Sequence, residues 1–186
     1  MKFAKQLIAL ATVAAAFSAY AESDINTGTG ALSAVARLDF RVIVPKVLFL
    51  QVGTGTAFAD VTTIDRVDFT LTAAQATSGA AVAGVSTGGA INARVLGNGG
   101  TVTFGAAGTV GGLTNGAGQT IPWTQIAPTA TGGSLIHPVI DAAPVSLAAT
   151  AGVVNSSTVY SFNYSNTNVV AAGTYNGQVT YTASVL

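Results

Sequence analysis

The stretch YNGQVTYTASV, residues 175–185 of a 186-residue chain, decides the fold class. Its larger side chains, Tyr175, Val179, Tyr181 and Val185, alternate with Asn, Gln, Thr and Ser. A period of two places successive side chains on opposite faces of a β-strand, and one apolar face indicates a half-buried strand. We therefore predict a closing strand that includes Gly173 and Gly177 and whose larger side chains face a core.

The same period recurs in earlier parts of the chain. From Ala34 to Val44 every second residue is apolar, and Arg37, Asp39 and Arg41 occupy the other face. Shorter alternations follow, and segments rich in Gly, Ala, Ser and Thr separate them and supply turns. Several short strands separated by turn signals predict an all-β fold, an antiparallel immunoglobulin-like β-sandwich.

Residues 1–21 have the pattern of an export signal. Lys2 and Lys5 precede an apolar run that is shorter than the roughly 20 residues of a membrane span. Ala19-Tyr20-Ala21 then matches a small-x-small cleavage site. We expect an exported protein without a membrane span after cleavage, in which residues 22–33 form an N-terminal extension and residues 34–186 form the β-sandwich domain.

Composition argues against several classes of function. The chain has 7 Lys and Arg, 7 Asp and Glu, and no Cys, and only 8% of it is charged. Nucleic-acid binding needs a basic patch, and disulfides or thiolate zinc sites need Cys. The single histidine, His137, has no second His beside it, whereas metal and catalytic sites need convergent partners. We predict no enzyme activity, no cofactor, no metal and no nucleic-acid partner.

Three weaker site signals have structural interpretations. Asp60, Asp65 and Asp68 are too widely spaced for a calcium loop. Gly97-Asn98-Gly99-Gly100 precedes a strand rather than a helix, which favours a hairpin turn over a phosphate loop. Aromatic residues that alternate along strands are more typical of core than of a sugar-binding platform. These are Trp123, Tyr160, Phe162, Tyr164, Tyr175 and Tyr181.

Both ends of the mature chain carry motifs of a known family. The tail AAGTYNGQVTYTAS, residues 171–184, resembles the closing strand of chaperone–usher pilins, which end in a pattern like A-G-x-Y-x-G-x-V. Residues 42–53, VIVPKVLFLQVG, look like the early strand of cysteine-free colonisation-factor pilins, where a Pro likewise interrupts an apolar strand. Ile121-Pro122-Trp123 and the stretch Phe162–Ser165 are also similar to a group of uncharacterised exported Gram-negative β-sandwich proteins.

This resemblance implies a structural subunit of a fimbria-like extracellular fibre that supports surface attachment. Such subunits assemble by donor-strand addition, in which a segment of one copy completes the sheet of the next. The implied partners are other copies or related subunits, a periplasmic chaperone and an outer-membrane usher, with transit through the periplasm to the cell surface. Ile25, Leu32, Ala34 and Ala36 are the expected donor residues, and Leu38 to Val44 is expected to remain the subunit's own first strand.

Two other functions fit the same residues. One is a monomeric secreted module that binds carbohydrate or protein, and the other is a matrix or coat protein without strand exchange. Neither the alternating strands nor the composition separates these alternatives from a fibre subunit.

Overall fold

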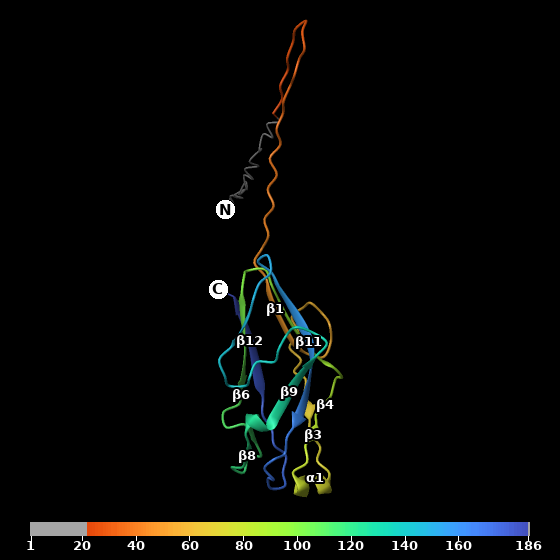
Figure 1. The fold of residues 1–186 in the computed structure, drawn as a ribbon, viewed down its shortest axis with the longest axis vertical. Coiled ribbons are helices and arrows are strands. Elements are labelled where there is room, and N and C mark those ends of the chain that lie inside the picture. Colours follow the sequence, from red (N-terminus) through yellow and green to blue (C-terminus); the bar gives the residue numbers. More distant parts are fainter. Residues whose placement is uncertain (1–21, 186) are drawn as a thin grey trace, which may run out of the picture. The chain divides into compact units, whose positions relative to one another are not determined.

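The computed structural model describes residues 22–185, so the predicted export signal and Leu186 lie outside the described residues (Figure 1). The chain divides between Val44 and Pro45 into two units. We call residues 22–44 the N-terminal unit and the part from Pro45 onward the strand-rich unit. Within residues 22–185, no helix has the length and apolar character needed to cross a bilayer.

The strand-rich unit consists of antiparallel sheets, which confirms the all-β class (Figure 1). The largest sheet has the order β1 (Leu48–Gly53), β5 (Ile91–Gly97), β11 (Val154–Tyr164) and β3 (Val82–Ala83), with β9 (Ile126–Thr131) also paired to β11. A second sheet has the order β10 (Val145–Leu147), β6 (Val102–Gly108) and β12 (Val179–Val185). Two ribbons pair β2 (Val67–Asp68) with β4 (Val85–Ser86) and β7 (Leu113–Thr114) with β8 (Thr120–Ile121).

Two short helices interrupt the strands. The helix α1 (Ala73–Ser78) begins at Thr72, whose hydroxyl accepts a hydrogen bond from the Gln75 backbone N–H in a capping box, and it ends at Gly79 in the left-handed conformation. A single 3₁₀ turn, η1 (Trp123–Gln125), precedes β9.

The main core takes residues from both larger sheets. Val95 of β5 and Val102 and Phe104 of β6 are completely buried, and Val154 and Tyr160 of β11 pack with them. Each large apolar side chain removed from water contributes about 1.5–3 kcal/mol. A smaller cluster forms around Ile121, Ile126 and Tyr164.

Along β12 the pattern of exposure has a period of two. Val179, Tyr181, Ala183 and Val185 are half-buried, whereas Thr180, Thr182 and Ser184 are exposed. The strand begins at Val179, so Gly173, Tyr175 and Gly177 precede it. Tyr175 packs against the smaller cluster, and Gly177 passes the indole ring of Trp123.

Asn98 does not form the predicted hairpin turn, because β5 and β6 belong to different sheets. Its side chain instead binds the chain just before β1. The Asn98 amide nitrogen Nδ2 donates to the Pro45 carbonyl at 2.8 Å, and its Oδ1 accepts from the Val47 N–H at 2.7 Å. The Asn98 N–H also donates to the Val47 carbonyl at 3.2 Å. The turn therefore carries the chain from one sheet to the other.

The strand predicted from Ala34 to Val44 is wrong, because none of these residues is in a strand and all are exposed. The first strand of the sheets begins at Leu48. It follows that the expected first strand Leu38–Val44 is not part of the subunit's own sheet. A period of two shows which side chains share a face, but it does not show that the same chain supplies a partner strand.

The N-terminal unit folds back on itself around Thr29 and Gly30. The Glu22 carboxylate accepts from the Arg37 guanidinium at 2.8 Å, and the Asp24 carboxylate accepts from the Val35 N–H at 3.2 Å. Asn26 Nδ2 donates to the Ser33 carbonyl. Residues 22–37 thus form an irregular hairpin, and Leu38–Val44 lies beyond the last of these contacts.

Candidate functional site

The strands β1 and β12 each have one unpaired edge. Among the described residues, β1 pairs only with β5, and β12 pairs only with β6. Cα atoms of β1 and β12 lie within 8 Å of each other, yet no ladder joins the two strands. An unpaired edge presents free backbone N–H and C=O groups, which are a template for another strand.

A groove of about 1210 Å³ lies along these edges. One wall is β1 with the segment that follows it as far as Val67, and the other is Gly177–Tyr181. Apolar side chains supply much of the remaining lining, namely Phe69, Ile91, Leu113, Trp123, Ile126, Ile140 and Phe162. Ile91 and Phe162 also belong to or pack against the main core, so the groove leads to the interior between the strands. The groove is therefore a mixed, mainly apolar hollow beside two open strand edges.

The segment that follows β1 is fixed to it at two points. The Asp65 carboxylate accepts from the Thr54 N–H at 2.6 Å and from the Thr54 hydroxyl at 2.9 Å. Gly53 makes this approach possible, because its φ is +153° and a Cβ there would lie 2.6 Å from Asp65 Oδ2. The ring of Phe58 also packs on that of Phe49, with 4.5 Å between centroids. This wall of the groove is therefore held in place.

Trp123 anchors the opposite wall. Its indole N–H donates to the Thr109 carbonyl at 3.0 Å. A Cβ on Gly108 would lie 2.0 Å from the indole nitrogen, and one on Gly177 would lie 2.9 Å from the ring. The ring therefore needs a glycine at both positions, and it holds the chain in position as it enters β12.

His137 connects the aromatic residues of the two larger sheets. Its Nε2 shares a hydrogen bond of 2.7 Å with the Tyr181 hydroxyl of β12, and its ring meets those of Tyr160 and Phe162 of β11 edge to face at 4.8 and 5.6 Å. Burial lowers the pKa of the imidazole, and its Nδ1 is buried without a hydrogen-bond partner among the described residues. The buried His137 ring, packed by aromatic rings, therefore forms part of the core, where burial favours its neutral form.

The expected donor residues lie in the N-terminal unit. Ile25, Leu32, Ala34 and Ala36 are all exposed, and all lie within the hairpin of residues 22–37. Leu38, Phe40, Val42 and Val44 are 71–86% exposed and alternate with Asp39, Arg41 and Ile43. Leu38, Phe40, Val42 and Val44 are more apolar than the expected donor residues, and no contact of the hairpin involves them.

Asp65 and Asp68, two of the acidic residues considered for a calcium site, have different partners in the structure. Asp65 binds Thr54, and Asp68 forms an exposed ion pair of 2.7 Å with Arg66. Within residues 22–185 no three His, Asp or Glu side chains gather in a geometry that could hold a metal ion. Of the predicted aromatics, Tyr160 and Tyr164 are buried in the two clusters.

Sequence reasoning missed the groove itself. The continuous apolar run Leu48–Val52 indicates a strand, but it does not show that one edge stays open. The signal that could have found it is the segment after β1, where Phe58, Val61 and Ile64 are apolar in a stretch without a strand pattern and are exposed in the structure. No protein-family model, curated protein or solved structure matches this chain.

Proposed function

We propose that this protein is a structural subunit of an extracellular fibre and that one copy adds a strand to the groove of the next. In this proposal the strand-rich unit is an immunoglobulin-like sandwich that lacks a strand at the open edge of β1. One observation carries the proposal: the chain has both an open apolar groove and an unpaired segment of alternating apolar residues. Strand addition joins the two by main-chain hydrogen bonds and side-chain pockets.

The donor is residues 38–44, rather than the hairpin residues Ile25, Leu32, Ala34 and Ala36. At about 3.3 Å per residue, seven residues extend over about 23 Å. The groove strands are of the same length, since β1 has 6 residues and β12 has 7. Leu38, Phe40, Val42 and Val44 then enter the groove, and each contributes about 1.5–3 kcal/mol of burial before the cost of ordering the segment.

The contacts of Asn98 favour a donor from another copy. For the segment to reach the free edge of its own β1, the chain would have to reverse at Pro45–Val47. Asn98 binds this stretch through three hydrogen bonds, to the Pro45 carbonyl and to both backbone groups of Val47. Reversal would break them, whereas addition to a second copy leaves them intact.

The proposal extends to the partners that the resemblance implies. Other copies of this chain or related subunits supply the donor segment in the fibre. A periplasmic chaperone covers the groove before assembly, because an exposed apolar groove with open strand edges promotes aggregation. An outer-membrane usher then passes the subunits to the cell surface, where the fibre supports attachment.

A paired substitution in the donor segment tests this function. Phe40→Asp places a charge on the face that enters the groove, and Arg41→Asp places the same charge on the opposite face. The full chain with Arg41→Asp should form fibres visible by electron microscopy, whereas Phe40→Asp should remain monomeric by light scattering with an unchanged unfolding midpoint. Fibres from Phe40→Asp, or monomers from the unaltered protein when no chaperone is present, would contradict strand addition.

A further inference from the structure

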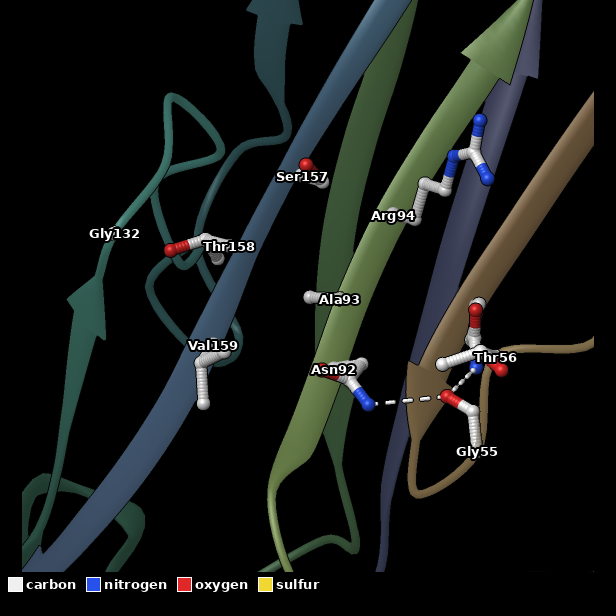
Figure 2. A pocket seen from close by; sticks show the side chains of 10 residues that line it. Gly55, Thr56, Asn92, Ala93, Arg94, Gly132, Ser157, Thr158 and Val159 are labelled. Atoms are coloured by element: carbon white, nitrogen blue, oxygen red, sulfur yellow. Dashed lines mark hydrogen bonds between the residues drawn. The ribbon is translucent and has the colours of Figure 1, made fainter.

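The outward face of the largest sheet carries a shallow trough of about 240 Å³ (Figure 2). Its rims are Gly55 and Thr56 on one side and Gly132 on the other, and its floor lies on β1, β5 and β11. The core residues of β5, such as Ala93 and Val95, alternate with the side chains on this face. The row of side chains at its centre therefore lies on the opposite face from the core, although Gln51, Gly55 and Thr56 also line the groove.

The centre of the trough is one row of polar side chains across three strands. Gln51 of β1 is the register partner of Arg94 of β5, and Arg94 is the register partner of Ser157 of β11. Neighbouring strands lie about 4.8 Å apart, so the row places an amide, a guanidinium and a hydroxyl at regular intervals.

Arg94 makes no side-chain hydrogen bond or ion pair with any residue among 22–185, although it is half-buried. Arg66, by contrast, pairs with Asp68. A guanidinium offers a planar fork of donors that matches a carboxylate, and partial burial strengthens such a pair. In a chain that is only 8% charged, this cation in a hollow is suited to an anionic ligand.

The neighbouring side chains provide hydroxyl recognition. Gln51 Nε2 donates to the Gly55 carbonyl at 2.8 Å, and Asn92 Nδ2 donates to the same carbonyl at 3.0 Å, a bond that Figure 2 marks with a dashed line. Their amide oxygens are therefore left as acceptors, and the Ser157 hydroxyl makes no hydrogen bond within the described part of the chain. Acceptors beside a cationic fork fit a molecule that has both hydroxyls and a carboxylate.

We propose that this trough binds a hexuronic acid, with its carboxylate on Arg94 and its hydroxyls on Gln51, Asn92 and Ser157. The volume is below the roughly 300–1,000 Å³ of pockets for larger ligands, which limits the site to one sugar ring. This inference does not rest on strand addition, because Asn92, Arg94 and Ser157 line the trough and not the groove.

Titration of the full chain with galacturonic acid tests the site, with galactose as a control that has a hydroxymethyl group in place of the carboxylate. We expect saturable binding of galacturonic acid by NMR chemical shifts, and at least about tenfold weaker binding of galactose. Arg94→Gln should weaken binding by a similar factor, and Arg66→Gln should leave it within about twofold. Inorganic phosphate at equal concentration should not displace the sugar acid.

A second variant keeps the test valid if Arg94→Gln fails to fold. Ser157→Asp introduces an acid at the exposed register partner of Arg94, so it should occupy the guanidinium and abolish binding while the melting temperature stays unchanged. Equal binding of galactose, displacement by phosphate, full affinity in the folded Arg94 or Ser157 variant, or no binding at all would overturn the proposal.

Discussion

The strand β12 and the segment Leu38–Val44 have the same alternation of apolar and polar residues but different surroundings. In β12 the apolar residues pack against the core, and the strand pairs with β6 from Val179↔Gly108 to Val185↔Val102. In the segment the apolar residues are exposed, and no strand of the described chain pairs with it. The comparison teaches that an alternating pattern shows that a segment can form a strand. It does not show whether the partner strand comes from the same chain or from another copy.

The largest expected difference is in the stability of the isolated subunit. Tyr181→Ala removes a half-buried ring that stacks near Phe104 and binds His137, so it should lower the free energy of unfolding by about 3 kcal/mol. Phe40→Ala should change it by less than about 0.5 kcal/mol, because the ring is exposed. Urea unfolding of monomeric protein measures both, and similar losses in the two variants would break the comparison.

Substitutions on the two faces of β12 test the comparison between β12 and Leu38–Val44 more finely. Val179→Asp puts a charge on the half-buried face and should cost about 2 kcal/mol, whereas Thr180→Asp on the exposed face should cost less than about 0.5 kcal/mol. Thermal melting followed by circular dichroism distinguishes them. Equal melting temperatures would show that the assigned register of β12 is incorrect.

A smaller effect is expected from pH, through His137. Because burial lowers the pKa of its imidazole in the folded state, the unfolded chain binds a proton first as the pH falls below about 6.5. The stabilising contribution of the neutral ring is therefore present above pH 6.5 and is lost as the pH falls toward the lower folded pKa. Melting temperatures between pH 7.5 and pH 5 should fall for the unaltered protein and fall less for His137→Gln. An identical slope in the two proteins would contradict this role.

The sequence predicts the parts of the fold that depend on neighbouring residues. The period of two along Tyr160-Ser161-Phe162 and along β12 follows from the chain itself, because faces alternate within a strand. It does not predict which edges remain unpaired, because strand order joins residues far apart in the chain, such as β1 with β5 and β5 with β11. The strand predicted over Leu38–Val44 was wrong for the same reason, because its partner strand could not be seen in the chain.

Side-chain contacts between strands that are far apart in the chain cannot be predicted from the sequence either. Asn98 next to Gly99 has the sequence of a hairpin, yet its amide binds Pro45 and Val47. Arg94 alternates with apolar residues in Ile91–Gly97, as a residue on a solvated strand face does. Only the strand register shows that Gln51 and Ser157 lie beside it. In both cases the deciding partner lies more than forty residues away.

Cross-linking between two marked copies tests strand addition most directly, because the chain contains no cysteine of its own. One copy carries Phe40→Cys in the donor segment, and the other carries a size tag with Val52→Cys on the inward face of β1, which lines the groove. Arg41→Cys in place of Phe40→Cys is the matched control. Under mild oxidation the account predicts a disulfide heterodimer of tagged and untagged chains for Phe40→Cys and little for Arg41→Cys. Equal yields from the two donors, or monomers alone, would contradict it.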